Sequence, residues 1–194
     1  MSNEQSAHKP YKFGYFSGPD VDLPFKYSDV WSLEKTSGQD RLVIAASESQ
    51  IDLMVELCNL MPEPYFVLYV LVVPRSDKAP GRYQSPNPLS IAALSAFVSR
   101  FREYFECDGR HALWIGAPDH SFLLVYDRHN VIYAYGPLDV FEKALRVRGM
   151  TEVTNVVLPS PHAHQYNSEF DADEASVLAY MPWLFSPLRE DDDL

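Results

Sequence analysis

A run of nine consecutive apolar residues, 65–73, constrains the fold most. Such a run cannot alternate between core and solvent, and its β-branched and aromatic content is typical of a strand buried on both faces. It is also too short to cross a bilayer, which needs about 20 apolar residues. We therefore expect residues 65–73 to form the central strand of a sheet in a soluble protein that does not enter the membrane.

The segments around this run predict an α+β fold. Turn signals and alternating apolar residues indicate two N-terminal hairpins, the second made of Val30–Glu34 and Arg41–Ala45. Short connections between His111–Gly116, 121–126 and 131–135 indicate an antiparallel β-meander. We expect one largely antiparallel sheet of about six or seven strands, with helices packed mainly on one face.

Short motifs predict where the helices begin. Ser47 with Gln50 fits a capping box, as does Asp171 with Glu174, and Asn87 precedes a proline in a pair typical of a helix N-terminus. Residues 75–86 look like a solvated loop, and residues 151–158 like a further strand. We expect three parts: an N-terminal arm or edge hairpin in residues 1–28, a single α+β domain in 29–188, and an acidic tail in 189–194.

Charge limits the partners that this chain can have. Acidic residues outnumber basic ones by 27 to 16, which gives a formal charge of −11. This field repels phosphate backbones, so we expect no nucleic-acid binding. A basic protein partner suits the same field. The acidic run at residues 190–193 is typical of a solvated tail.

Two cysteines, Cys58 and Cys107, are too few for a disulfide framework in a chain of 194 residues. We interpret them as reduced thiols of a cytoplasmic protein, because the N-terminal residues lack a secretory signal pattern. The acidity and the lack of catalytic motifs are of a type seen in small bacterial interaction or immunity proteins, although no motif carries that comparison.

The most distinctive polar segment contains His162 and His164, just ahead of several carboxylates. Side chains at positions i and i+2 of a strand share a face, so both imidazoles could bind one cation. Zinc is the expected ion, because histidine nitrogens are among its preferred ligands. Glu169, Asp171 or Asp173 could complete the shell. The alternative is a polar strand end that leads into a capped helix. Two histidines fall short of a zinc site, so a remote residue such as His111 or His129 would have to join.

A second polar cluster lies at the ends of the meander strands. It has an Asp, an Arg and a His in each of two loops, namely Asp108, Arg110, His111, Asp127, Arg128 and His129. An Asp can orient an imidazole while an Arg holds an anion, so these residues are candidates for a catalytic site. The alternative is turn chemistry, in which the Asp side chains bond to the backbone.

Two hypotheses about function follow. The first is a non-enzymatic protein-binding module that uses its negative surface against a basic partner. The second is a metal-assisted hydrolase or small-molecule enzyme built on His162 and His164. Convergence of the histidines in space would favour the second. The sequence leaves the substrate, the strand order and the oligomeric state open.

Overall fold

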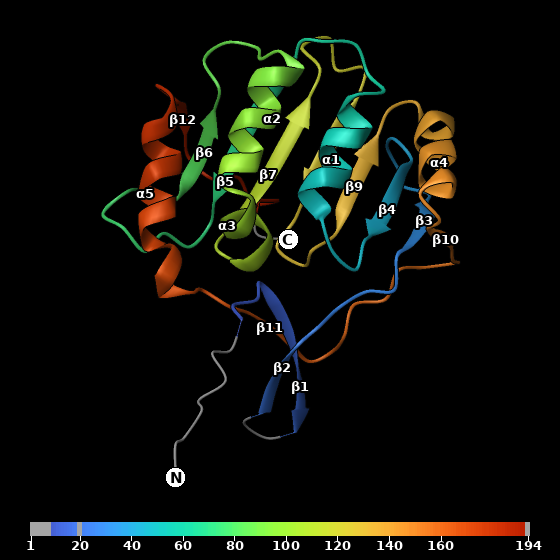
Figure 1. Ribbon diagram of the computed structural model, residues 1–194, viewed down its shortest axis with the longest axis horizontal. Coiled ribbons are helices and arrows are strands. Elements are labelled where there is room, and N and C mark those ends of the chain that lie inside the picture. Colours follow the sequence, from blue (N-terminus) through green and yellow to red (C-terminus); the bar gives the residue numbers. More distant parts are fainter. Residues whose placement is uncertain (1–8, 19–20, 193–194) are drawn as a thin grey trace.

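The computed structural model describes residues 9–18 and 21–192, and its centre is a nine-stranded sheet with helices on the near face in Figure 1. Every strand pair in this sheet is antiparallel except β10 with β3, which confirms the expected largely antiparallel α+β fold. The sheet has nine strands rather than the expected six or seven. The strand order is β10 (Thr151–Glu152), β3 (Val30–Glu34), β4 (Arg41–Ala45), β9 (Ile132–Tyr135), β8 (Leu123–Tyr126), β7 (His111–Gly116), β5 (Phe66–Leu71), β6 (Gly81–Gln84) and β12 (Leu184–Ser186).

A second, three-stranded sheet lies below the first in Figure 1. Its order is β11 (His162–His164), β1 (Phe13–Gly18) and β2 (Val21–Pro24), and all pairs are antiparallel. The expected N-terminal hairpin is therefore confirmed, and Pro24 ends its edge strand, where a missing N–H costs no sheet bond. Residues 19 and 20 of the expected turn lie outside the described residues.

The helices contribute their apolar stripes to one core against the nine-stranded sheet. They are α1 (Gln50–Cys58), α2 (Ile91–Arg100), α3 (Arg102–Cys107), α4 (Leu138–Val147) and α5 (Asp171–Tyr180), the last preceded by a short 3-10 turn, η1 (Ser168–Phe170). Alternate strand residues such as Leu113 and Ile115 meet these stripes and are fully buried. None of the helices in the described part of the chain covers the other face of the sheet, which is called the helix-free face below (Figure 1).

The apolar run 65–73 forms β5 as expected, but its place in the sheet is different. The strand lies between β7 and β6, two strands from the edge, and β8 is the middle strand. Val67 and Tyr69 are buried under the helices, whereas Phe66 and Leu68 are half-buried on the helix-free face. A continuous apolar run predicts burial on both faces, and here the second face is only partly covered.

Two predicted helix starts are wrong because other groups bind the backbone. Ser47 forms no capping box, since its N–H and hydroxyl donate to the Asp29 carboxylate at 2.8 Å. The N-terminus of α1 is instead bound by Glu106, whose Oε1 accepts from the Ile51 N–H at 2.9 Å. The cap of α2 is Ser90, three residues after Asn87.

Both edges of the large sheet differ from the sequence prediction. Residues 75–86 are not only a loop, because they contain β6, which pairs with both β5 and β12. The strand expected at 151–158 is reduced to β10, whose last bond to the sheet is the Val153 N–H to the Trp31 carbonyl. Beyond this point the chain leaves the nine-stranded sheet and delivers β11 to the small one.

None of the helices in residues 9–18 and 21–192 combines the length and the apolar character that a bilayer crossing requires. Cys58 and Cys107 are free thiols, as predicted.

Candidate metal centre

Three histidines converge where the two sheets meet. His162 and His164 lie on β11, and His129 lies in the turn between β8 and β9 of the large sheet. One ligand nitrogen from each ring lies within 4.8 Å of the other two. The i, i+2 spacing on β11 does place both rings on one face, as predicted, and His129 is the remote third residue that the site needs.

The ring of His129 is held by Asp127 from the same turn. Nδ1 of His129 lies 2.9 Å from Oδ2 of Asp127, and a carboxylate can only accept, so Nδ1 carries the proton. Oδ1 of Asp127 accepts from the N–H groups of His129 and Val131, both at 2.9 Å. Asp127 thus shapes the turn and leaves the Nε2 lone pair of His129 free for a ligand bond.

His162 is oriented in the same way by the backbone. Its Nδ1 lies 3.0 Å from the Pro159 carbonyl oxygen, another pure acceptor, so Nδ1 again carries the proton. The Nε2 lone pair is then available. The His162 side chain is exposed, so the cluster is open to solvent on this side.

His164 is the more buried of the two strand histidines, and it is neutral. Burial lowers the pKa of its imidazole to about 3, with further lowering by the positive charge of Arg128. Its Nδ1 is buried and has no hydrogen-bond partner among the described residues. A neutral imidazole is the form that binds a metal ion, and a buried nitrogen without a partner is costly unless it gains one.

An aromatic wall closes the inner side of the cluster. The buried ring of Phe13 on β1 lies 5.3 Å from the rings of His129 and His162 and 5.8 Å from that of His164, centroid to centroid. Phe13 is paired with His164 in the small sheet. An apolar wall of this kind excludes water from one side and fixes the rings against one another.

The spacing suits a metal ion after a small contraction. With Zn–N bonds of about 2.0–2.1 Å, ligand nitrogens of a tetrahedral site lie roughly 3.4 Å apart. The three nitrogens lie within 4.8 Å of one another, so a shift of roughly 1 Å in the side chains would close the site. A group of three histidines in the described residues could therefore hold a metal.

A buried ion network fixes the segment that follows β11. The guanidinium of Arg110 is fully buried and binds both oxygens of Asp108, at 2.7 and 3.0 Å. It also donates to Glu174 at 2.8 Å and to the Asn167 carbonyl at 2.8 Å. Asp108 in turn accepts from the Asn167 N–H at 2.7 Å. Asn167 lies three residues after His164, so this network holds the end of β11 against the large sheet.

Gly109 lets the two sheets come close. A Cβ at this position would lie 2.9 Å from the Lys12 carbonyl oxygen and 2.9 Å from Cβ of His164. The Gly109 N–H donates to the Gln165 carbonyl at 2.8 Å, and the Gln165 N–H donates to that of Lys12 at 2.9 Å. Only a residue without a side chain fits this approach.

The other predicted site residues lie elsewhere. The ring of His111 is buried in the core on the helix side of the sheet, with its centroid 4.4 Å from that of the Tyr104 ring. It is not part of the three-histidine cluster. Asp171 pairs with Arg75 and Arg110, and Glu174 accepts from the Arg75 N–H, so neither forms the expected cap. These carboxylates, like the exposed Glu169, are not in the cluster.

The sequence indicated all members of this centre, but it left the third ligand open between His111 and His129. The structure takes His129 from the second cluster and joins it to His162 and His164. The Asp-x-His spacing of Asp127 and His129 was the available signal, because an Asx-turn puts the carboxylate next to the imidazole.

Comparison of the chain with protein-family models, with curated proteins and with solved structures finds no match in any of the three.

Proposed function

We propose that the protein binds a divalent metal ion, zinc by its ligand chemistry, at His129, His162 and His164 and supports metal-assisted hydrolysis. The observation that carries this proposal is the convergence of three ligand nitrogens within 4.8 Å, on rings that Asp127 and the Pro159 carbonyl orient. A nitrogen set of this kind suits zinc, and the carboxylate-histidine pair is the usual outer-shell support of a zinc ligand.

Three protein ligands favour a catalytic role over a purely structural one. Structural zinc sites normally have four protein ligands, whereas catalytic sites have three and keep a position for water. Zinc would lower the pKa of that water to about 7 and so supply hydroxide at neutral pH. The exposed side of His162 leaves room for a substrate to approach.

The surrounding residues support this chemistry. The Asp127 carboxylate fixes the tautomer of His129 and stabilises positive charge that builds up on its ring. Arg128 lies close enough to lower the pKa of His164, so its positive field would also favour an anionic substrate or a developing oxyanion. Phe13 keeps water from the inner side of the cluster.

A hydrolysis assay tests the proposal. Chelator-treated protein is loaded with one equivalent of zinc and assayed with p-nitrophenyl acetate and bis-p-nitrophenyl phosphate. We expect hydrolysis of at least one ester to exceed that by the same concentration of free zinc, and its rate to rise with pH through about 7. The variant His162→Ala should fall to the rate of the metal-free protein.

His120→Asn is the matched control. His120 lies outside the cluster, and its φ of 60° is one that asparagine tolerates. This variant should keep full activity. Zinc-loaded protein that hydrolyses neither ester faster than free zinc would contradict the catalytic role and leave an ion that only joins the two sheets.

A second candidate function, the protein-binding module, is favoured by a different observation. The helix-free face of the large sheet carries half-buried apolar side chains around a hollow of about 550 Å³. Its binding partner is a separate question from the metal centre, because no residue of that hollow belongs to the three-histidine cluster.

A further inference from the structure

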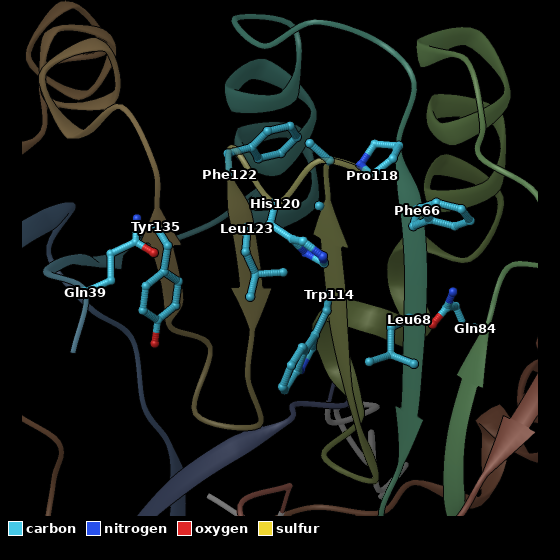
Figure 2. Close-up of a pocket in the computed structure, with 12 residues that line it drawn as sticks. Gln39, Phe66, Leu68, Gln84, Trp114, Pro118, His120, Phe122, Leu123 and Tyr135 are labelled. Carbon is cyan, nitrogen blue, oxygen red and sulfur yellow. The ribbon is translucent and has the colours of Figure 1, made fainter.

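Two hollows lie side by side on the helix-free face of the large sheet. The larger one, of about 550 Å³, is shown in Figure 2, with Trp114 on β7, Leu68 on β5 and Leu123 on β8 along its floor. The smaller one, of about 150 Å³, shares Trp114, Leu123 and Tyr135 with it. A single extended ligand could therefore occupy both.

The two hollows differ in charge. The larger hollow is lined by aromatic and aliphatic side chains with a few polar groups, among them Gln39, Gln84 and His120. The smaller hollow is lined by Arg41 and Arg128 as well as by acidic residues. A matching ligand has an apolar group at one end and an anionic group at the other.

The chain's own tail already places a carboxylate at the charged end. Asp192 is buried, its side chain pairs with Nη1 of Arg82 on β6, and Asp191 and Asp192 line the smaller hollow. Arg82 is itself buried and lies over the Trp114 ring, 4.8 Å from its centroid. The expected solvated tail is thus in part a buried contact.

Arg82 needs an anion. A buried guanidinium without a partner is strongly unfavourable, so a molecule that displaces Asp192 has to supply a replacement carboxylate. The tail therefore shows which chemistry this end of the face accepts. Two of the three acidic residues that line the smaller hollow, Asp191 and Asp192, belong to the tail itself. A ligand that takes the place of the tail therefore has to match Arg82, and this requirement is the opposite of the basic partner that the net charge of −11 suggests.

We propose that the helix-free face binds an extended acidic peptide segment of a partner protein, with an aspartate or glutamate on Arg82 and a large apolar side chain in the larger hollow. The C-terminal tail is an internal competitor that holds the carboxylate position until such a segment displaces it. Because a tethered tail has an effective concentration in the millimolar range, the competition weakens binding by free peptides.

A labelled peptide with the sequence of residues 187–194, Pro-Leu-Arg-Glu-Asp-Asp-Asp-Leu, serves as the probe. Fluorescence anisotropy measures its binding to the full chain and to Asp192→Asn, in which the internal carboxylate is lost. We expect at least tenfold tighter binding to Asp192→Asn, and loss of that binding in Asp192→Asn/Arg82→Gln. Arg148→Gln in the same background is the matched control, since Arg148 pairs with Glu56 at the far end of α4.

Changes in the peptide test the two halves of the proposal. Replacing its three aspartates by asparagines should abolish binding. Replacing its final leucine by phenylalanine should strengthen binding, and replacing it by alanine should weaken it several-fold. Equal affinities for the phenylalanine and alanine peptides would overturn the apolar half, and binding that survives Arg82→Gln would overturn the charged half.

The wild-type protein gives an independent readout if Asp192→Asn does not fold. Millimolar unlabelled peptide should shift the indole N–H signal of Trp114 in a two-dimensional NMR spectrum and leave that of the fully buried Trp31 unchanged. An unchanged Trp114 signal at saturating peptide would contradict the proposal.

Discussion

The carboxylate of Asp127 binds the imidazole of His129 at 2.9 Å and the backbone of the turn that carries it. One side chain therefore sets both the position and the tautomer of a candidate metal ligand. The two other ligands come from β11 in the small sheet, 33 and 35 residues later. The metal centre depends on how the two sheets meet, and the buried network around Arg110 holds them together.

Replacing Asp127 tests its orienting role. In Asp127→Asn the amide can present a donor to Nδ1 and reverse the tautomer of His129, so we expect zinc affinity to fall about 10- to 100-fold. Zinc titration against a competing chelator measures this. Asp119→Asn is the control. The Asp119 carboxylate also accepts a backbone N–H of its turn, that of Ser121, but it orients none of the three histidines of the cluster. Equal losses in both variants would mean that only turn geometry matters.

Lys12 gives a pH-dependent stability. Burial lowers the pKa of its ammonium to about 7, against opposing contributions from Asp127 and Asp108. In the unfolded chain the group keeps its ordinary pKa near 10.4, so between about pH 7 and 10 the unfolded state binds the extra proton. Stability should therefore rise with pH in this window, by about 2 kcal/mol from pH 7 to 9.

Denaturant unfolding of wild type and Lys12→Met at both pH values isolates this effect, because other titrating groups cancel in the difference. The variant should lack the rise. It should also fold, since its apolar side chain fits the buried site beside Tyr126. A rise of the same size in both proteins would assign the pH dependence to another group.

The buried network should dominate the stability of the contact between the sheets. Arg110→Met leaves Asp108 and Glu174 without their buried cation, and we expect a loss of about 3–5 kcal/mol in the free energy of unfolding. Arg75→Met is the matched control: it breaks the Asp171 pair, but the Arg75 side chain is 38% exposed. It should cost much less than Arg110→Met, because an exposed ion pair is screened by water. Equal losses of unfolding free energy in the two variants would contradict the larger contribution of the buried network.

The two thiols should be unreactive in the folded protein. Burial raises the pKa of Cys58 to about 12 and that of Cys107 to about 11, so little thiolate forms at neutral pH. Iodoacetamide should modify neither residue under native conditions and both after denaturation, as read by intact mass. Rapid native labelling of Cys58 would show that the core around α1 opens readily.

Local patterns predicted what depends on neighbouring residues. The meander turns around residues 117–120 and 127–130, and the β3–β4 hairpin, follow from chain connectivity and are confirmed. The predicted helix starts at Ser47 and Asn87 were wrong for two different reasons. Ser47 donates to the Asp29 carboxylate instead of capping α1, and Ser90 caps α2 in place of Asn87. Only the packing of the whole chain decides between such alternatives.

Pairing between segments far apart in the chain could not be predicted, because it too depends on how the whole chain packs. β12 is short and exposed, and its only pairing is with β6, across about 100 residues. β6 itself is a short polar segment that pairs with β5 as well as with β12. His162 and His164 could be recognised as a pair from their spacing. His129 could be named only as an alternative to His111 for the third ligand, because its position depends on the approach at Gly109 and on the network around Arg110.

Zinc calorimetry is the most direct test of the metal centre. Chelator-treated wild type should bind one equivalent of zinc with a saturable heat. His129→Ala and the double variant His162→Ala/His164→Ala should bind at least 100-fold more weakly, because they lose one and two ligands of a three-histidine set. His120→Asn should match the wild type. Equal, weak heats for wild type and the double variant would contradict the centre and leave the three histidines as ordinary side chains at the junction of two sheets.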